Sequence, residues 1–509
     1  MFFLLFSWSL LNPPAFGSTL NIPLMEAPVS LDWNGLSTMI EAPLILNLNE
    51  GLFGHDPESG VLIPALADSV SKSRDLMTYT FKIRKDAKWS DGRPILSGDF
   101  ANAWFRLLSP QSVSIYIYYL FDIVNAKEFN RGEVQNPAQV GITVVDDHTL
   151  TVRLKRPHPD WERTTAFWPL FPVRKDQIEK YGANWWRPGV LVSSGPFTLE
   201  SYETGKSVVL KRNPHSAAVK SDIDTLNFQI GSDRDEMIRK FKSGFFEFLW
   251  GLPPNLLREA LPDQTPVDLE LLRGHLLALN TAKFPMSNRE FRKGILKAVS
   301  AASVLPSDSS HLIPVKTFIP PPLPGSGSPA VLEFNPAEAR EHIRKSGILR
   351  TSKLKIRILT GLSEPFLSIG RNLQRDLGKT LGLNVELDAR QSRDYTTYMN
   401  LGDYDATLIT WTAKVLSPQD FLLPYSRDAT YNRMNYSSSI FEKRIQEGVR
   451  ARTPTEASKR FLEAQLVLTR SDAVASPLFR EKAVMVRSSS IKKIYFNHMG
   501  IPLLKHATH

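Results

Sequence analysis

Two short stretches of this 509-residue chain have residue types that bind phosphate in many nucleotide-dependent proteins. Gly-Lys-Ser at 205–207 and Gly-Lys-Thr at 378–380 match the end of a phosphate-binding loop, whose backbone N–H groups close around phosphate oxygens. That loop needs another glycine five positions before its second glycine, where this chain has Glu200 and Leu373. Both stretches are therefore predicted to be turns.

The other residues that could perform chemistry form no recognisable catalytic set. The ten histidines are scattered, and their one close pair, His506 and His509, lies at the C-terminus. Two pairs of carboxylates, 146–147 and 403/405, fall in a turn and just before a strand, where Asp commonly caps or turns the backbone. Neither a Gly-x-Ser-x-Gly elbow nor a His-Glu-x-x-His motif occurs. The sequence predicts a non-enzymatic protein with no metal site and no cofactor.

One strand end has the residue types of a ligand contact. Residues 407–420, TLITWTAKVLSPQD, begin as a short apolar strand, continue through Trp411 and Lys414, and break into a loop at Ser417-Pro418. Strand ends beside loops are where α/β proteins place many ligand contacts. Trp411 and Lys414 are therefore candidate binding residues.

Composition limits the possible classes of protein. A chain of 509 residues, 42% of them hydrophobic, predicts two or three globular domains. The net charge is +10, but positive and negative residues are interleaved, so no nucleic-acid partner is expected. Cysteine is absent, which excludes disulfides, thiolate metal sites and lipid attachment at an N-terminal cysteine.

The N-terminal residues 1–17 are predicted to be a signal peptide. Their apolar stretch is too short to span a bilayer, and Ala15-Phe16-Gly17 supplies small residues at the spacing of a cleavage site. A positively charged beginning is missing. We expect an exported, periplasmic protein that is not a lipoprotein.

Hydrophobic periodicity predicts the elements that position these residues. Alternation at 79–84 indicates a strand, Ser97 is a candidate N-cap for the next helix, and 141–154 should form a β-hairpin. Asn335-Pro336 with Glu338 has the pattern of a helix start. Further on, 354–360, 366–381 and 383–389 alternate as strand, helix and strand, which predicts a right-handed parallel crossover and an α/β fold.

Several stretches together resemble one known family, the extracytoplasmic solute-binding proteins (family 5) of oligopeptide and dipeptide ABC importers, and most closely its oligopeptide-binding branch. In chain order the matching stretches are 51–69, 79–100, 160–186, 191–214, 276–300 and 334–347.

The resemblance implies a two-lobed, hinged periplasmic-binding-protein fold with mixed sheets and an extra domain inserted in lobe one. Domain I would comprise 18–48, 189–272 and 488–509, domain II 49–188, and domain III 273–487. Family members hold an extended peptide between the lobes through its backbone, and lobe closure is read by the permease and ATPase subunits of the importer. A monomer is expected.

The resemblance also implies a set of ligand-binding residues. In the peptide-binding branch a Trp-x-Ala-Asp motif ends a strand of domain III, and its aspartate holds the α-ammonium of the peptide. The matching position here is Lys414, which cannot hold an ammonium group. The complete predicted set is Ala27, Pro28, Val29, Tyr116, Tyr119, Trp411, Thr412, Ala413 and Lys414.

Two interpretations of Lys414 follow. Either the site takes a ligand with an anionic or blocked end, or Lys414 faces solvent and another acid, such as Asp403, Asp405 or Asp420, replaces the aspartate. The leading function is capture of peptides for an ABC importer. The alternatives are a non-peptide or modified-peptide ligand (a cell-wall peptide, an opine or a nickel complex) and, from another class, an exported peptide hydrolase.

Overall fold

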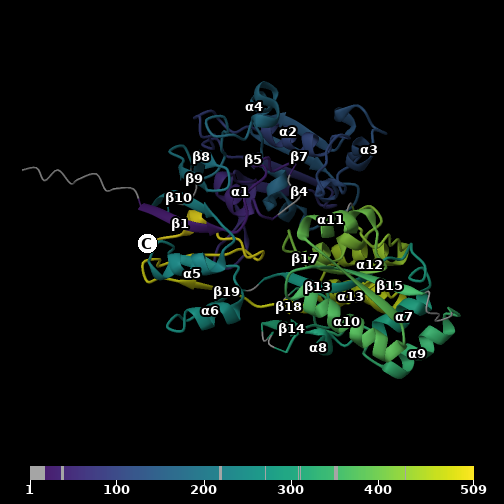
Figure 1. Ribbon diagram of the computed structural model, residues 1–509. Helices are drawn as coiled ribbons and strands as arrows, with labels where there is room; N and C mark the ends of the chain where they lie inside the picture. The colour runs from purple at the N-terminus through teal and green to yellow at the C-terminus, as the bar shows by residue number, and fades with distance from the viewer. Residues whose placement is uncertain are drawn as a thin grey trace, which may run out of the picture.

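The computed structural model describes residues 18–35, 39–216, 221–269, 271–307, 309, 311–321, 323–348, 354–429 and 431–509. The predicted signal peptide, residues 1–17, lies outside this range. Within it, no helix has both the length and the apolar character needed to cross a membrane. We call the part between Arg273 and Glu481 lobe two and the rest of the described chain lobe one (Figure 1).

Lobe two is built on a six-stranded mixed sheet in the order β14-β18-β13-β17-β15-β16. Strands β15 and β16 are parallel, and α10 connects them, which confirms the predicted crossover. β17 is antiparallel to β13 and lies in the middle of the sheet. The strands are β13 (Arg273–Leu279), β14 (Leu312–Pro314), β15 (Lys355–Gly361), β16 (Asn384–Arg390), β17 (Ala406–Thr412) and β18 (Ala475–Glu481).

Helices flank this sheet and bury their apolar faces against it (Figure 1). α9 begins as predicted, because the Asn335 side chain accepts the N–H groups of Ala337 and Glu338 at 3.1 Å each. The helices are α7 (Arg289–Lys297), α8 (Ala301–Val304), α9 (Pro336–Lys345), α10 (Phe366–Leu381), α11 (Ser392–Leu401), α12 (Ser439–Val449) and α13 (Pro454–Leu466).

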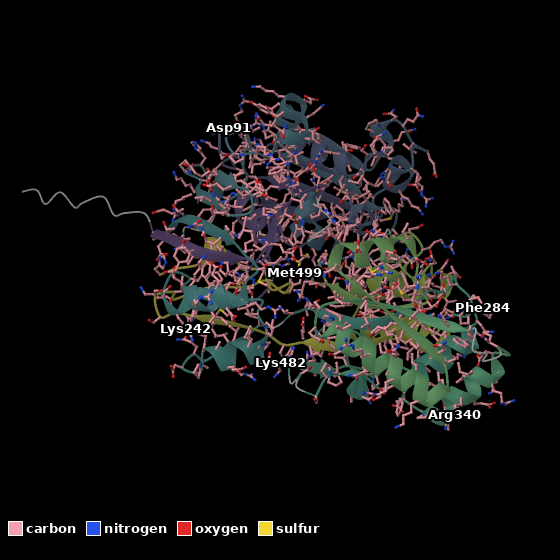
Figure 2. The ribbon with its side chains drawn as sticks, in the orientation of Figure 1. Asp91, Lys242, Phe284, Arg340, Lys482 and Met499 are labelled. Atoms are coloured by element: carbon pink, nitrogen blue, oxygen red, sulfur yellow. The ribbon has the colours of Figure 1, made fainter. Side chains whose placement is uncertain are left out.

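Lobe one gathers segments that are far apart in the sequence. β1 pairs in parallel with β10, although about 200 residues separate them, and β19, near the C-terminus, pairs with β11 and β12. β19 was expected in domain III. Figure 2 places Lys482 on the stretch where the chain leaves lobe two for β19. The elements are β1 (Ser18–Leu24), α1 (Ala42–Leu48), β8 (Phe197–Glu203), β9 (Ser207–Arg212), β10 (Ile223–Ile230), α5 (Arg234–Lys242), β11 (Phe248–Trp250), α6 (Pro254–Ala260), β12 (Val267–Leu269) and β19 (Ala483–Arg487).

The predicted insertion contains a four-stranded antiparallel sheet in the order β4-β5-β7-β6 and the hairpin β2–β3. Tyr79, Phe81 and Ile83 of β5 are buried, as their alternation predicts. α2 begins at Ser97, but Leu96 is its N-cap and Asp99 accepts the Leu96 N–H at 2.9 Å. The elements are β2 (Phe53–His55), β3 (Leu62–Pro64), β4 (Ala67–Lys72), β5 (Thr78–Ile83), α2 (Ser97–Leu107), α3 (Ala126–Asn130), β6 (Ile142–Asp146), β7 (Thr149–Arg153) and α4 (Lys175–Tyr181).

Candidate functional site

The C-terminal half of β17 has a free backbone edge. β15 pairs with β17 only through Ala406 and Thr407, whereas β13 follows it to Thr412. The Ala413 N–H donates to the Leu272 carbonyl at 2.9 Å. Because bonded pairs alternate along an antiparallel ladder, the backbone groups of Thr410 and Thr412 point away from β13. The backbone groups of Thr410 and the N–H of Thr412 are available to another chain, whereas the Thr412 carbonyl accepts the Lys414 ammonium at 2.9 Å.

A cavity of about 280 Å³ lies beside this free edge and between the two lobes. It contains four of the predicted binding residues, Tyr116, Trp411, Thr412 and Lys414. The residues that line it are Met39, Ile115, Tyr116, Tyr118, Arg273, Thr410, Trp411, Thr412, Lys414 and Tyr431.

Trp411 anchors the loop that follows β17. Its side chain is buried, and its indole N–H donates to the Asp420 carbonyl at 2.8 Å. The ring centroid lies 5.1 Å from that of Tyr431. Trp411 therefore serves both as part of the core and as a wall of the cavity.

Lys414 is 8% exposed and does not face bulk solvent. Its ammonium group donates to the Thr412 carbonyl at 2.9 Å and lies 5.4 Å from the centroid of the Trp411 ring. Burial lowers the pKa of Lys414 to about 8, against an opposing effect of the Asp420 charge. The solvent-facing alternative is therefore wrong.

The three acids considered as replacements have other partners. Asp403 pairs with Lys283 at 3.0 Å and also with Arg357. The Asp405 carboxylate accepts the Arg357 backbone N–H at 2.8 Å. Asp420 accepts the backbone N–H groups that follow Ala413. None of these three acids lines the 280 Å³ cavity.

Asp420 also connects the two lobes. The hydroxyl of Tyr119, from lobe one, donates to its carboxylate. Burial raises the pKa of Asp420 to about 6, although the bonds from Tyr119 and from the Lys414 N–H lower it. A second contact joins Lys127 to Asp428 across the lobes at 2.7 Å. The lobes are therefore in direct contact, as in a closed binding protein.

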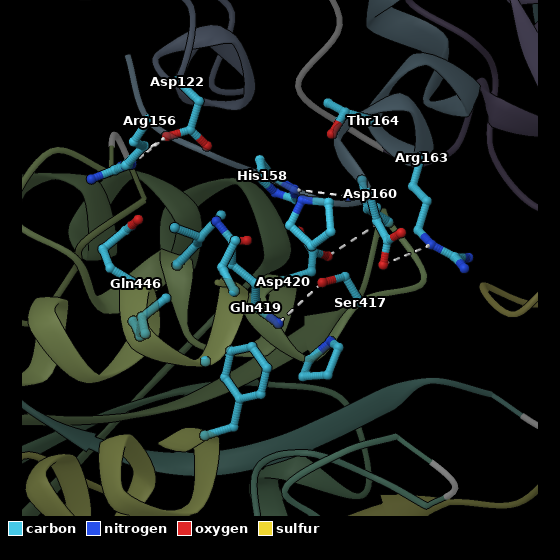
Figure 3. A pocket seen from close by; sticks show the side chains of 18 of the residues that line it. Asp122, Arg156, His158, Asp160, Arg163, Thr164, Ser417, Gln419, Asp420 and Gln446 are labelled. Carbon is cyan, nitrogen blue, oxygen red and sulfur yellow. Dashed lines mark hydrogen bonds and ion pairs between the residues drawn. The ribbon is translucent and has the colours of Figure 1, made fainter. Parts of the chain in front are cut away.

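A larger cavity of about 740 Å³ lies on the other side of this contact. Figure 3 shows His158 of lobe one close to Gln419 and Asp420 of lobe two, and all three residues line this cavity. Tyr119 lines this larger cavity and not the smaller one, whereas Tyr118 lines both. The stack of Tyr118 on Tyr119, with centroids 4.6 Å apart, thus lies between the two cavities.

The predicted contacts at 27–29 and Ala413 line neither cavity. The Pro28 carbonyl accepts the Tyr202 hydroxyl at 2.6 Å, and the Val29 N–H donates to Glu41 at 3.2 Å. The Val29 side chain is 83% exposed. Residues 27–29 lie on the lobe-one side, where part of their backbone hydrogen bonding is already used, and Ala413 of lobe two donates its N–H to the Leu272 carbonyl.

Sequence reasoning missed Arg273 and Tyr431. Arg273 is the first residue of β13, and its Nε donates to the Thr412 side chain at 3.1 Å. Only the register of β13 against β17 reveals this contact. Within the described ranges, no three His, Cys, Asp or Glu residues are grouped so that they could hold a metal ion.

Comparison with known proteins identifies the family of this chain and its fold. The model of a family described as bacterial extracellular solute-binding proteins, family 5, middle region, matches residues 61–433. The chain is 25% identical over 473 residues to the periplasmic oligopeptide-binding protein OppA of Salmonella typhimurium, covering 90% of this chain and 86% of the relative. The structure of the Escherichia coli murein tripeptide binding protein MppA superposes with a TM-score of 0.83 at 24% identity, covering 97% of this chain and 98% of that one. An unliganded open form of MppA scores 0.70 at 23% identity, with 97% and 96% covered.

Proposed function

We propose, since the chain belongs to family 5 of the bacterial extracellular solute-binding proteins, that it captures peptides between its lobes for an ABC importer. The relatives that match over most of its length include proteins named for binding oligopeptides and a murein tripeptide. Peptide is therefore the leading ligand class.

One observation carries the proposal: the free edge of β17, at Thr410 and the N–H of Thr412, faces a cavity between lobes that touch. An extended peptide placed there would gain main-chain hydrogen bonds that do not depend on its side chains. Aromatic rings of Tyr116, Trp411 and Tyr431 would cover it on both sides. Such a site binds many sequences of similar length.

The predicted division into domains fits this role. Domain I would comprise 18–48, 189–272 and 488–509, domain II 49–188, and domain III 273–487. The pairing of β1 with β10 supports the discontinuous domain I, and the pairing of β19 with β11 and β12 favours an end of domain III near Lys482.

The remaining features of the proposal follow from the family and the sequence. The protein is exported with residues 1–17 as its signal, acts in the periplasm as a monomer without lipid, and has no enzymatic activity. Its partners are the permease and ATPase subunits of the importer, which respond to the closed form.

The test is to unfold and refold the protein to remove co-purified ligand, incubate it with a mixture of tri- to hexapeptides, and identify retained molecules by native mass spectrometry. Retention of intact peptides supports the proposal. Cleaved peptides would support the hydrolase alternative, and retention of no peptide would overturn the proposal in favour of a non-peptide ligand such as an opine or a nickel complex.

A further inference from the structure

Two cations flank Thr412 where β17 ends. The Lys414 ammonium donates to the Thr412 carbonyl at 2.9 Å, and Arg273 Nε donates to the Thr412 side chain at 3.1 Å. Both side chains line the 280 Å³ cavity. The cavity is therefore positively charged at the C-terminal end of β17.

Both cations have hydrogen-bond donors to spare. An ammonium group has three N–H donors, and the described residues supply one hydrogen-bond acceptor to Lys414, the Thr412 carbonyl. A guanidinium has five, and Arg273 uses one on Thr412 and directs another toward Glu481 at 3.4 Å. A ligand in the cavity can accept the rest.

No acidic side chain is among the residues that line this cavity in the described part of the chain. The nearby acidic side chains do not line the cavity and interact with other groups. Glu481 pairs with Arg273 and lies 3.5 Å from His275, Asp420 accepts the Tyr119 hydroxyl, and Glu41 accepts a backbone N–H. Lys414 thus forms no ion pair with a described residue; beyond the Thr412 carbonyl, the Trp411 ring and the charge of Asp420, an anionic ligand group would further favour its charged form.

We propose that the pocket formed by Lys414, Arg273 and Thr412 binds a carboxylate of the ligand, so that the ligand end seated at the end of β17 is anionic. This inference rests on the proposed peptide-binding function and names its substrate class. A carboxylate accepts from both cations and completes the hydrogen bonding of the buried ammonium. Because Lys414 already occupies the Thr412 carbonyl, the backbone pairing of the guest ends before this point.

A carboxylate at this position has two possible sources, the C-terminus of the peptide or an acidic group attached to its amino end. Calorimetry at pH 7 with four versions of one tetrapeptide separates them: unmodified, C-terminally amidated, N-acetylated and N-succinylated. If amidation lowers the affinity tenfold or more, the group bound in this pocket is the C-terminal carboxylate of the peptide. If the N-succinylated peptide binds tenfold more tightly than the N-acetylated one, the group bound is the acidic group attached to the amino end.

Two other results would overturn the inference while leaving the proposed function intact. One is binding of the unmodified peptide that changes less than threefold on amidation and on succinylation. The other is a tenfold loss of affinity on N-acetylation with no loss on amidation and no gain on succinylation, which shows that the site requires a free ammonium and not a carboxylate. Binding of no version would overturn the proposed function together with this inference.

Variants locate the effect at the pocket. We expect Lys414→Met to reduce at least tenfold the difference in affinity between peptides with and without the carboxylate. Arg273→Gln should reduce this difference as well. With two variants, the result does not depend on the folding of one of them. Lys206→Met, whose side chain is 78% exposed on the hairpin between β8 and β9, is the matched control and should bind as the wild type. A carboxylate preference that persists in both pocket variants, with circular dichroism unchanged, would contradict the assignment.

Discussion

The hydroxyl of Tyr119 donates a hydrogen bond to the carboxylate of Asp420, 301 residues away and in the other lobe. The same carboxylate accepts the backbone N–H groups of Lys414 and Val415, which follow β17 directly. Closure of the lobes and the shape of the 414–415 turn are therefore coupled through one side chain.

Tyr119→Phe should weaken ligand binding by about tenfold. A hydrogen bond to a charged group contributes about 1.5–3 kcal/mol, and here it forms between the lobes only when they meet. Isothermal calorimetry measures the affinity, and small-angle scattering measures the fraction of open molecules. Tyr181→Phe is the control, since Tyr181, the last residue of α4, lines neither cavity. Equal losses in both variants would contradict this prediction.

Lys414→Asp should improve the binding of peptides with free amino termini by about tenfold relative to their N-acetylated forms. The substitution places a carboxylate at the end of β17, where an ammonium group now lies, and reverses the local charge. Lys414→Asn separates the removal of the positive charge from the addition of the negative one. Calorimetric affinities that do not change would show that Lys414 is not near the amino end of any bound peptide.

Binding of a carboxylate ligand should weaken above pH 8. Burial lowers the pKa of Lys414 to about 8, and a bound carboxylate favours the charged ammonium, so binding takes up a proton at higher pH. Affinity should then fall by up to about tenfold for each pH unit above 8.

Two neighbours of Lys414, Asp420 and His498, titrate below this range. The pKa of Asp420 is about 6, and burial lowers that of His498 to about 3. Calorimetry in buffers of different ionisation enthalpy counts the protons taken up. Lys414→Met should remove this uptake, and an unchanged pH dependence in that variant would assign it to another group.

Gly195→Ala should destabilise lobe one by about 1–3 kcal/mol. A Cβ at this position would lie 2.7 Å from the Asn49 backbone nitrogen, and a backbone atom cannot move aside as a side-chain end can. The expected result is a lower midpoint of thermal unfolding by circular dichroism. Gly231→Ala, where a Cβ meets nothing within 4 Å, is the control. Similar midpoints for both variants would show that the contact at Asn49 relaxes easily.

Local elements were predictable because their causes are local. The alternation at Tyr79, Phe81 and Ile83 and the cap at Asn335 depend on residues a few positions apart, and both predictions are confirmed. The strand–helix–strand order also predicted the parallel pairing of β15 with β16, since crossover handedness leaves few alternatives.

The composition of the site was only partly predictable. The pattern around Trp411 and Lys414 indicated a strand end with ligand contacts, and both side chains line the cavity between the lobes. Tyr119, expected to form a wall of the cleft, lines the larger cavity between the lobes and bonds Asp420 there, and it does not line the smaller cavity. Whether the residues at 27–29 touch a ligand stays a prediction.

The sequence by itself determined which segments are strands and helices, that the fold is α/β, and that a lysine stands at the end of β17. Only the tertiary structure decided that this lysine is buried, that Arg273 joins it on Thr412, and that Tyr119 meets Asp420. The reason is physical: periodicity and capping act over a few residues, whereas burial, strand register and lobe contact depend on pairings between distant residues, here 139 and 301 positions apart.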